Sequence, residues 1–160
     1  MTAPTTVPDG YQSVNPWLIN ARTAEVIDFL VEVFEATERG RMEVDGVIGH
    51  AEVQIGDSVI MMFDSPPDWP PTPCFLRFYV PDDAAVHRRA IAAGARVVTE
   101  PTEMSWGDRI SRIADPFGNL YWIHQHVADV DEAEAERRMT LPRFQEAMAS
   151  VQSVEFHPGR

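Results

Sequence analysis

The chain has a single cysteine, Cys74, among its 160 residues, which excludes an internal disulfide and fits a reducing cytoplasm. Cys74 lies in an apolar run, so a buried and inert thiol is its expected state. The N-terminus lacks the basic flank and the apolar stretch of a signal peptide, and no window approaches the length of a membrane span. We therefore expect a soluble, cytoplasmic protein.

Positive charge is also scarce in this sequence. The 13 basic side chains are outnumbered by 25 acidic ones, for a net charge of −12. An acidic body repels the phosphates of nucleic acid and the anionic surface of a membrane, so we expect neither as a partner. Much of the acidity falls in residues 129–136, a run that is typical of a solvated helix start.

Alternating and helical apolar patterns are present in the first half of the chain. Pro16 suggests an edge strand or a bulge, and Thr23 is a fair N-cap for an apolar helix that packs on the core. Asp45-Gly46 is the strongest hairpin signal of the sequence. The expected elements are a strand over 13–20, a helix from Thr23, and strands over 39–44, 49–55 and 58–63.

The proline-rich segment 65–73 predicts an extended linker, after which the same order of elements returns. Asp82 or Asp83 is expected to cap a helix that ends at Gly94, and two further helices are expected to begin near Asp131 and Thr140. The expected strands of this half cover residues 75–80, 96–99, 110–114 and 120–126. The predicted segments are an arm (1–10), two modules (11–64 and 74–127), the linker (65–73) and a helical tail (128–160).

Both modules thus have the order βαβββ. Each also contains a similar turn, Ile55-Gly56-Asp57 in the first module and Phe117-Gly118-Asn119 in the second. This order, with Gly-Asp-Ser-Val-Ile-Met-Met at 56–62 and Asp-Pro-Phe-Gly-Asn-Leu-Tyr-Trp at 115–122, resembles the vicinal oxygen chelate superfamily. That superfamily includes glyoxalase I, the bleomycin-resistance proteins and the extradiol dioxygenases. Four runs are similar to its PhnB-like branch, at 7–11, 48–52, 106–109 and 115–122. The resemblance implies an α+β fold with two paired βαβββ modules, a curled mixed sheet around a central cleft, and C-terminal helices.

The resemblance also predicts where a metal would bind. In the metalloenzymes of this superfamily, His, Glu or Gln at four strand positions holds a divalent metal. Carried over, these positions fall on Asn15, Met61 (Ile60 in an alternative register), Phe75 and Trp122. Such metals prefer oxygen and nitrogen ligands, and only Asn15 offers one. We therefore expect a member of the superfamily that uses neither a metal nor another cofactor.

The expected cleft is lined by the sheet faces that do not pack under the helices. Aromatic walls with a few polar groups suit a small planar or partly anionic organic molecule. Arg77 could clamp a carboxylate or phosphate, or could form a structural ion pair with Glu52 or another acid. The predicted ligand-binding residues are Asn15, Trp17, Met61, Phe75, Arg77, Tyr79, Trp106, Trp122 and His124.

His50 and Glu52 share one face of the strand expected over 49–55 and are the candidate catalytic residues. An imidazole titrates near neutrality, so His50 could act as a general base that Glu52 orients. The alternative is an exposed polar face at a sheet edge.

The sequence also predicts roles for the remaining histidines and for Asp108 and Arg109. His124 and His126 could form a relocated metal site with His50. Asp108 and Arg109 are expected to hold only their own loop. His87 is expected to be solvated on the second predicted helix, and His157 lies in the tail.

The leading hypothesis is a glyoxalase/bleomycin-resistance-like protein that sequesters a small organic molecule in its aromatic cleft without a metal. The alternatives are a lyase, isomerase or natural-product tailoring enzyme that uses His50 and Glu52, a metal enzyme with relocated ligands, and a docking role for the C-terminal helices. Whether the chain is an enzyme stays open at this point. The resemblance also implies a homodimer.

Overall fold

The computed structural model describes residues 5–70 and 72–153 and divides the chain into two compact units, Met1–Pro73 and Cys74–Arg160. The ends of the expected arm and tail, His157 included, and Pro71 of the expected linker lie outside the described residues. Within residues 5–70 and 72–153, no helix is long and apolar enough to span a membrane. The two units are described separately below, as unit 1 and unit 2.

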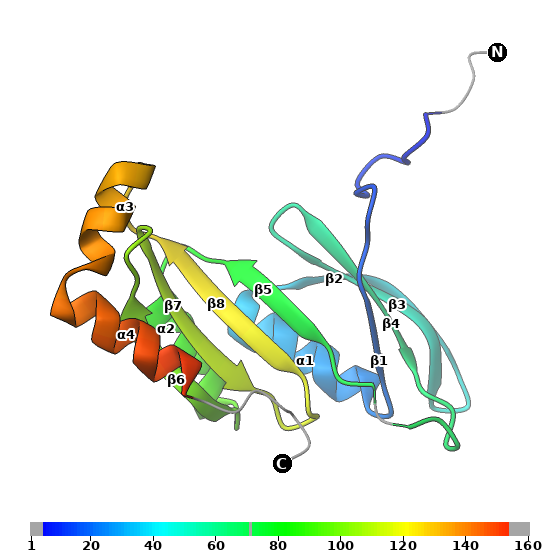
Figure 1. Ribbon diagram of the computed structural model, residues 1–160. Coiled ribbons are helices and arrows are strands. Elements are labelled where there is room, and N and C mark those ends of the chain that lie inside the picture. Colours follow the sequence, from blue (N-terminus) through cyan, green and yellow to red (C-terminus); the bar gives the residue numbers. More distant parts are fainter. Residues whose placement is uncertain (1–4, 71, 154–160) are drawn as a thin grey trace. The chain divides into compact units, whose positions relative to one another are not determined.

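Unit 1 has the expected order βαβββ. Its sheet is mixed, because β1 pairs in parallel with β4 while the other neighbouring strands are antiparallel. The strand order β1-β4-β3-β2 leaves β1 at an edge, as Pro16 suggested. The elements are β1 (Trp17–Asn20), α1 (Thr23–Phe34), β2 (Thr37–Val44), β3 (Val47–Ile55) and β4 (Ser58–Asp64) (Figure 1).

Helix α1 buries its apolar stripe against one face of this sheet. The stripe comprises Val26, Ile27, Leu30, Val33 and Phe34, all of which are buried. Each such side chain contributes roughly 1.5–3 kcal/mol on leaving water. The expected core face of the helix is therefore confirmed.

The start of α1 differs from the prediction, because Thr23 is not the N-cap. The N-cap residue is Arg22, which makes no side-chain capping bond. Instead Asp64, at the end of β4, accepts the Thr23 backbone N–H at 2.9 Å and the Ile48 backbone N–H at 2.7 Å. A carboxylate from 41 residues away in the sequence thus satisfies the first turn of the helix.

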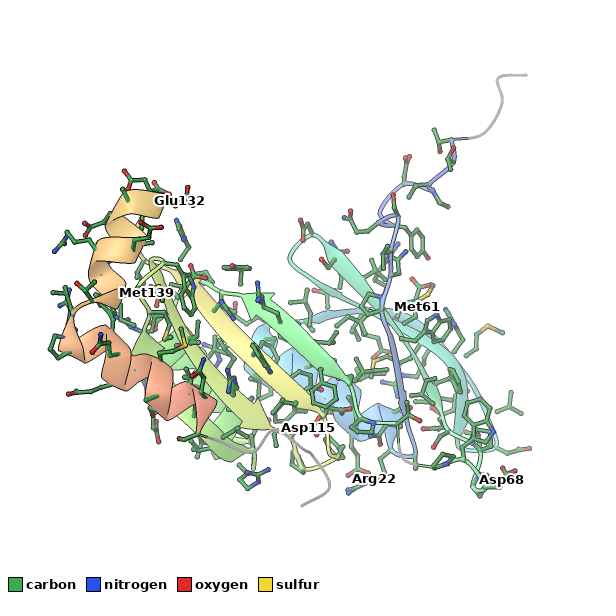
Figure 2. All side chains as sticks on the ribbon, in the orientation of Figure 1. Arg22, Met61, Asp68, Asp115, Glu132 and Met139 are labelled. Carbon is green, nitrogen blue, oxygen red and sulfur yellow. The ribbon has the colours of Figure 1, made fainter. Side chains whose placement is uncertain are left out.

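Unit 2 repeats this topology, with strand order β5-β8-β7-β6 and a parallel β5–β8 pair. Asp82 caps α2 through the Ala85 N–H, Gly94 follows the helix with φ +92°, and Asp131 caps α3 through the Glu134 N–H. The elements are β5 (Phe75–Tyr79), α2 (Asp83–Ala92), β6 (Arg96–Glu103), β7 (Asp108–Ala114), β8 (Leu120–His126), α3 (Glu132–Met139) and α4 (Pro142–Gln152) (Figures 1 and 2). The predicted α+β fold with C-terminal helices is confirmed; Thr140 ends α3, and α4 begins at Pro142.

Helices α2 and α4 cover opposite faces of the second sheet. Ser111 donates a hydrogen bond to Asp83 of α2, whereas its neighbour Ile110 packs with Ala147 and Val151 of α4. Successive strand residues point to opposite faces, so the two helices lie on different sides of β7. Figure 1 shows α4 running beside β6 and β7.

The expectation that His87 is solvated is wrong. The buried residues of α2 are Asp83, Val86, His87 and Ala90, a helical spacing that turns His87 towards the sheet, where it is only 5 % exposed. Cys74 is half-buried, not fully buried as expected, and burial raises the pKa of its thiol to about 12.

Candidate functional site

The face of the first sheet that points away from α1 holds the candidate catalytic residues. His50 and Glu52 alternate with the buried Ala51 and Val53 along β3. This strand lies between β4 and β2, so the two side chains belong to an interior strand and not to a sheet edge. Across the sheet, Glu52 pairs with Met61, which in turn pairs with Trp17.

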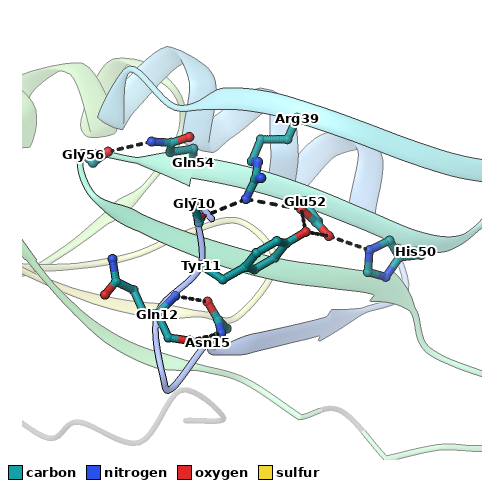
Figure 3. Close-up of polar contacts among 9 residues, drawn as sticks. All are labelled: Gly10, Tyr11, Gln12, Asn15, Arg39, His50, Glu52, Gln54 and Gly56. Carbon is teal, nitrogen blue, oxygen red and sulfur yellow. Dashed lines mark hydrogen bonds and ion pairs between the residues drawn. The ribbon is translucent and has the colours of Figure 1, made fainter. Parts of the chain in front are cut away.

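The Glu52 carboxylate is the centre of a polar cluster (Figure 3). It accepts the Tyr11 hydroxyl at 2.9 Å from each oxygen, and His50 Nε2 lies 3.1 Å from its Oε1 atom. Arg39 Nη1 lies 3.5 Å from Oε2 and also donates to the Gly10 carbonyl at 3.2 Å. The Arg39 guanidinium is 4.6 Å from the centre of the Tyr11 ring. The segment before β1 is thereby held against β2 and β3.

This environment keeps Glu52 ionised. Burial raises the pKa of Glu52, but hydrogen bonds from His50 and Tyr11 and the charge of Arg39 outweigh it, so the net shift is downward. The hydrogen bond to Glu52 in turn raises the pKa of Tyr11. An ionised carboxylate only accepts hydrogen bonds, so His50 must donate from Nε2. In the neutral imidazole of His50, the lone pair is then on Nδ1.

The cluster borders a hollow of about 410 Å³. One side of it adjoins aromatic surface, since the Trp17 ring lies 5.8 Å from the His50 ring and 5.5 Å from the Phe63 ring. The residues that line the hollow are Tyr11, Arg39, Gly40, Arg41, Met42, His50 and Glu52. The hollow thus combines a cation, an ionised carboxylate and an imidazole, and the imidazole lies beside an indole.

Tyr11 and Arg39 are site residues that the sequence prediction missed. Gly10-Tyr11 belongs to one of the runs that carried the family resemblance, which was the available signal for Tyr11. No local signal distinguishes Arg39 from other strand arginines. Asn15, which was predicted to bind a ligand, instead bonds the Gln12 backbone with both ends of its amide and closes a turn.

The donor set at the usual metal positions does not fit a hard divalent ion. Met61 lies on the face of Glu52, whereas Ile60 is buried under α1, so the register that places Met61 at the second position matches the structure. Figure 2 labels Met61 on β4. A thioether is a soft ligand, and neither Phe75 nor Trp122 can coordinate a metal. Across residues 5–70 and 72–153, no three His, Cys, Asp or Glu side chains gather as for a metal ion, at His124 and His126 or elsewhere.

The other predicted ligand-binding residues lie in unit 2. Phe75, Arg77, Tyr79 and Trp106 are exposed, Trp122 is half-buried, and His124 is buried. Trp122 stacks under the Arg112 guanidinium at 4.1 Å. The expectation that Asp108 holds only its own loop is wrong, because Asp108 accepts hydrogen bonds from Tyr79, His124 and His126.

The fold, the open sheet faces and the sequence together define the class of this protein. The chain belongs to the Glyoxalase/Bleomycin resistance protein/Dioxygenase superfamily, whose family model matches residues 14–123. Among individual proteins, it is 34 % identical over 140 residues to the uncharacterized protein Mb0911c of Mycobacterium bovis, which covers 80 % of this chain and 92 % of that protein.

Solved structures confirm the fold. TioX from Micromonospora sp. ML1 has a TM-score of 0.58 at 24 % identity and covers 72 % of this chain and 100 % of its own. A PhnB protein from Bacillus cereus has a TM-score of 0.56 at 13 % identity, and the match covers 71 % of this chain and 99 % of the Bacillus cereus chain. The fosfomycin resistance protein FosX from Listeria monocytogenes has a TM-score of 0.57 at 18 % identity, with 77 % and 94 % covered. The family model confirms the superfamily predicted from the sequence, and a PhnB protein is among the structural neighbours.

Proposed function

We propose that the protein binds a small, planar organic anion on the open face of unit 1 and needs no metal to do so. The observation that supports this best is the hollow of about 410 Å³, which Arg39, His50 and Glu52 line and where the His50 ring lies 5.8 Å from the Trp17 ring. An indole offers stacking worth about 0.5–1.5 kcal/mol beyond the area it buries. His50 and Arg39 supply the directional contacts that orient a polar ligand.

A structural neighbour supports the binding of a small organic anion, although its own complex also holds a metal. FosX from Listeria monocytogenes was solved in complex with Mn(II) and 1S,2S-dihydroxypropylphosphonic acid, a small organic acid. In the present chain the side chains at the usual metal positions are Asn15, Met61, Phe75 and Trp122, so apolar contacts and hydrogen bonds would have to supply the affinity. That the open faces of both units form one cleft, that the protein is a homodimer, and that it is cytoplasmic stay predictions.

Tryptophan fluorescence tests ligand binding. Benzoate and cyclohexanecarboxylate have the same charge and similar size, but only benzoate is planar. We expect benzoate and the dye 8-anilinonaphthalene-1-sulfonate to change the emission, and cyclohexanecarboxylate to bind more weakly. Trp17→Leu should weaken benzoate about fivefold, the equivalent of about 1 kcal/mol of stacking.

The matched control is Trp69→Leu, because Trp69 is an equally exposed indole of the same unit, 49 % against 47 % for Trp17. It should change the affinity less than twofold. If no aromatic anion changes the emission, the ligand-binding proposal fails. Stoichiometric zinc, nickel, iron or manganese that a chelator removes from purified protein would contradict its metal-free part.

A second candidate function is proton transfer by His50. It rests on the hydrogen bond to Glu52, which leaves the lone pair of His50 on Nδ1, and on the position of His50 in the lining of the hollow, as an oriented general base requires. A lyase or isomerase reaction would begin with such a step, in which His50 Nδ1 takes the proton from a carbon or oxygen of the ligand.

Exchange with D₂O separates the two functions without knowledge of the product. A general base would exchange an acidic C–H of a bound ligand for deuterium, and nuclear magnetic resonance (NMR) detects this loss of signal. His50→Gln should abolish the exchange and retain binding if His50 is catalytic. If His50→Gln weakens binding and no ligand exchanges in the wild-type protein, only the binding function remains.

A further inference from the structure

We propose a second ligand site, in unit 2, for a small oxyanion that also carries a hydroxyl group. Arg77 would bind the negatively charged group, and His124 Nε2 would accept a hydrogen bond from the hydroxyl. This site involves none of the residues of unit 1 and does not depend on the function proposed for them.

The proposal begins with an unsatisfied nitrogen. His124 is only 3 % exposed, and its Nδ1 atom lies 3.1 Å from Asp108 Oδ2. Its Nε2 atom is buried and finds no hydrogen-bond partner among the described residues. A buried polar atom without a partner costs about 1–3 kcal/mol, so its retention suggests a donor that binds from outside.

The hydrogen bonds of Asp108 determine which proton His124 carries. Asp108 also accepts hydrogen bonds from His126 Nδ1, at 3.0 Å, and from the Tyr79 hydroxyl, at 3.1 Å. Burial raises the pKa of Asp108, but these three hydrogen bonds outweigh burial and lower it, so the carboxylate is ionised. His124 must therefore donate from Nδ1, and its Nε2 atom is an acceptor.

Arg77 supplies the positive charge beside this acceptor. On β5, Arg77 and Tyr79 point to the same face, and they pair with Trp122 and His124 of β8. Two residues along a strand span about 7 Å. Arg77 is exposed, and within the described part of unit 2 it has no carboxylate as an ion-pair partner. Arg112, the other cation of this face, already donates to the Val151 carbonyl at 2.9 Å.

Tyr79 packs beside the His124 ring. Its ring centre is 5.3 Å from that of His124, and its hydroxyl reaches beyond the imidazole to Asp108. The Tyr79 side chain is nevertheless 61 % exposed, so it can rotate into solvent at the loss of one hydrogen bond. A ligand hydroxyl could then donate to Nε2 while its anionic group binds Arg77. Lactate and hydrogen phosphate have the required pair of groups.

Matched anions test the hydroxyl. The probes are lactate and inorganic phosphate, and their partners without a protonated hydroxyl at pH 7 are propionate and sulfate. The full chain is labelled with ¹⁵N-histidine, and NMR follows the Nε2 signal of each imidazole. Lactate or phosphate should shift the His124 Nε2 signal, whereas propionate and sulfate should leave it in place. His87, which is buried on α2 at the opposite face of the second sheet, serves as the internal reference.

Two variants complete the test. Arg77→Gln is an exposed substitution that should fold normally and weaken lactate and phosphate at least tenfold. Tyr79→Phe should strengthen them, because it frees the ring from Asp108. The proposal is overturned if the matched anions shift the His124 signal equally, or if the response survives Arg77→Gln. It is also overturned if no anion shifts the signal, which is the result expected if only a buried water occupies Nε2.

Discussion

The two units share one topology, and the rows of side chains across the sheet faces opposite α1 and α2 can be compared position by position. In unit 1 the row is Trp17, Met61 and Glu52, whereas in unit 2 it is Arg77, Trp122 and Arg112. The segment before β1 is held against the first face through Tyr11 and Arg39, and Trp69 packs on Phe63 of the same face. The second face is covered by α4, and Arg112 is buried beneath it.

The difference between the two faces shows that the segment covering a sheet face must supply partners for the charged side chain beneath it. A buried charge is tolerated only with partners that replace water. Glu52 takes them from a hydroxyl, an imidazole and a guanidinium. Arg112 takes them from the Val151 carbonyl, near the C-terminal end of α4, and from the Trp122 ring. The negative end of the helix dipole favours a cation there. The same fold thus leaves one face open for a ligand and closes much of the other.

Removing the anchor of α4 tests this comparison most strongly. Phe144 is buried on α4, and Phe144→Ala should lower the free energy of unfolding by about 3 kcal/mol, because a core phenyl group leaves a cavity. Urea denaturation measures the change. The exposed Met139→Ala on α3 is the control and should stay within about 0.5 kcal/mol. Equal effects of the two variants would mean that α4 does not depend on Phe144.

In each unit a side chain of the fourth strand accepts a backbone N–H from the first turn of the first helix. Asp64 accepts the Thr23 N–H at 2.9 Å, whereas its counterpart Gln125 accepts the Asp83 N–H at 3.3 Å. We expect Asp64→Ala to cost about 2 kcal/mol, because two backbone donors lose a carboxylate. Gln125→Ala should cost less than half of that. Chemical denaturation of both variants measures the loss in the free energy of unfolding. A larger loss for Gln125→Ala than for Asp64→Ala would contradict the prediction.

Asp83 makes unit 2 sensitive to pH. Burial raises the pKa of Asp83 to about 6, above its unfolded value near 3.8. The folded state therefore binds more protons than the unfolded state between about pH 4 and pH 6, and the free energy of unfolding falls as pH rises through that range. Asp83→Asn should flatten this dependence and raise stability at pH 7 by about 1–2 kcal/mol. Thermal melts from pH 4 to pH 8 measure it, and an unchanged slope would refute it.

The matched glycine turns should give the smallest difference. Gly56 has φ +58°, which other residues can adopt at some cost, whereas Gly118 has φ +96°. A Cβ atom would meet nothing within 4 Å at either position, so only backbone strain differs. Gly118→Ala should cost about 1–2 kcal/mol and Gly56→Ala about 1 kcal/mol. Denaturation midpoints compare them, and a reversed order would show that φ is not the cause.

Much of the architecture was predictable because its signals are local. Asp45-Gly46 forms the expected hairpin with φ +53° and +78°, and Asp82 and Asp131 cap the expected helices. The expectation for Thr23 failed because a distant carboxylate took the capping role, and that for His87 failed because charged neighbours concealed a buried helical face. Of the candidate site, His50 and Glu52 were recognised as neighbours on one strand, while Tyr11 and Arg39 were not.

The sequence by itself determined the order of strands, helices and turns, since strand alternation, helical spacing and capping all act within a few residues. Residue type alone also decides that Met61, Phe75 and Trp122 are poor ligands for a hard divalent metal. Only the tertiary structure decided which groups satisfy Glu52 and Arg112. Their partners Tyr11 and Val151 lie 41 and 39 residues away, and contacts at such separations depend on how the whole unit packs.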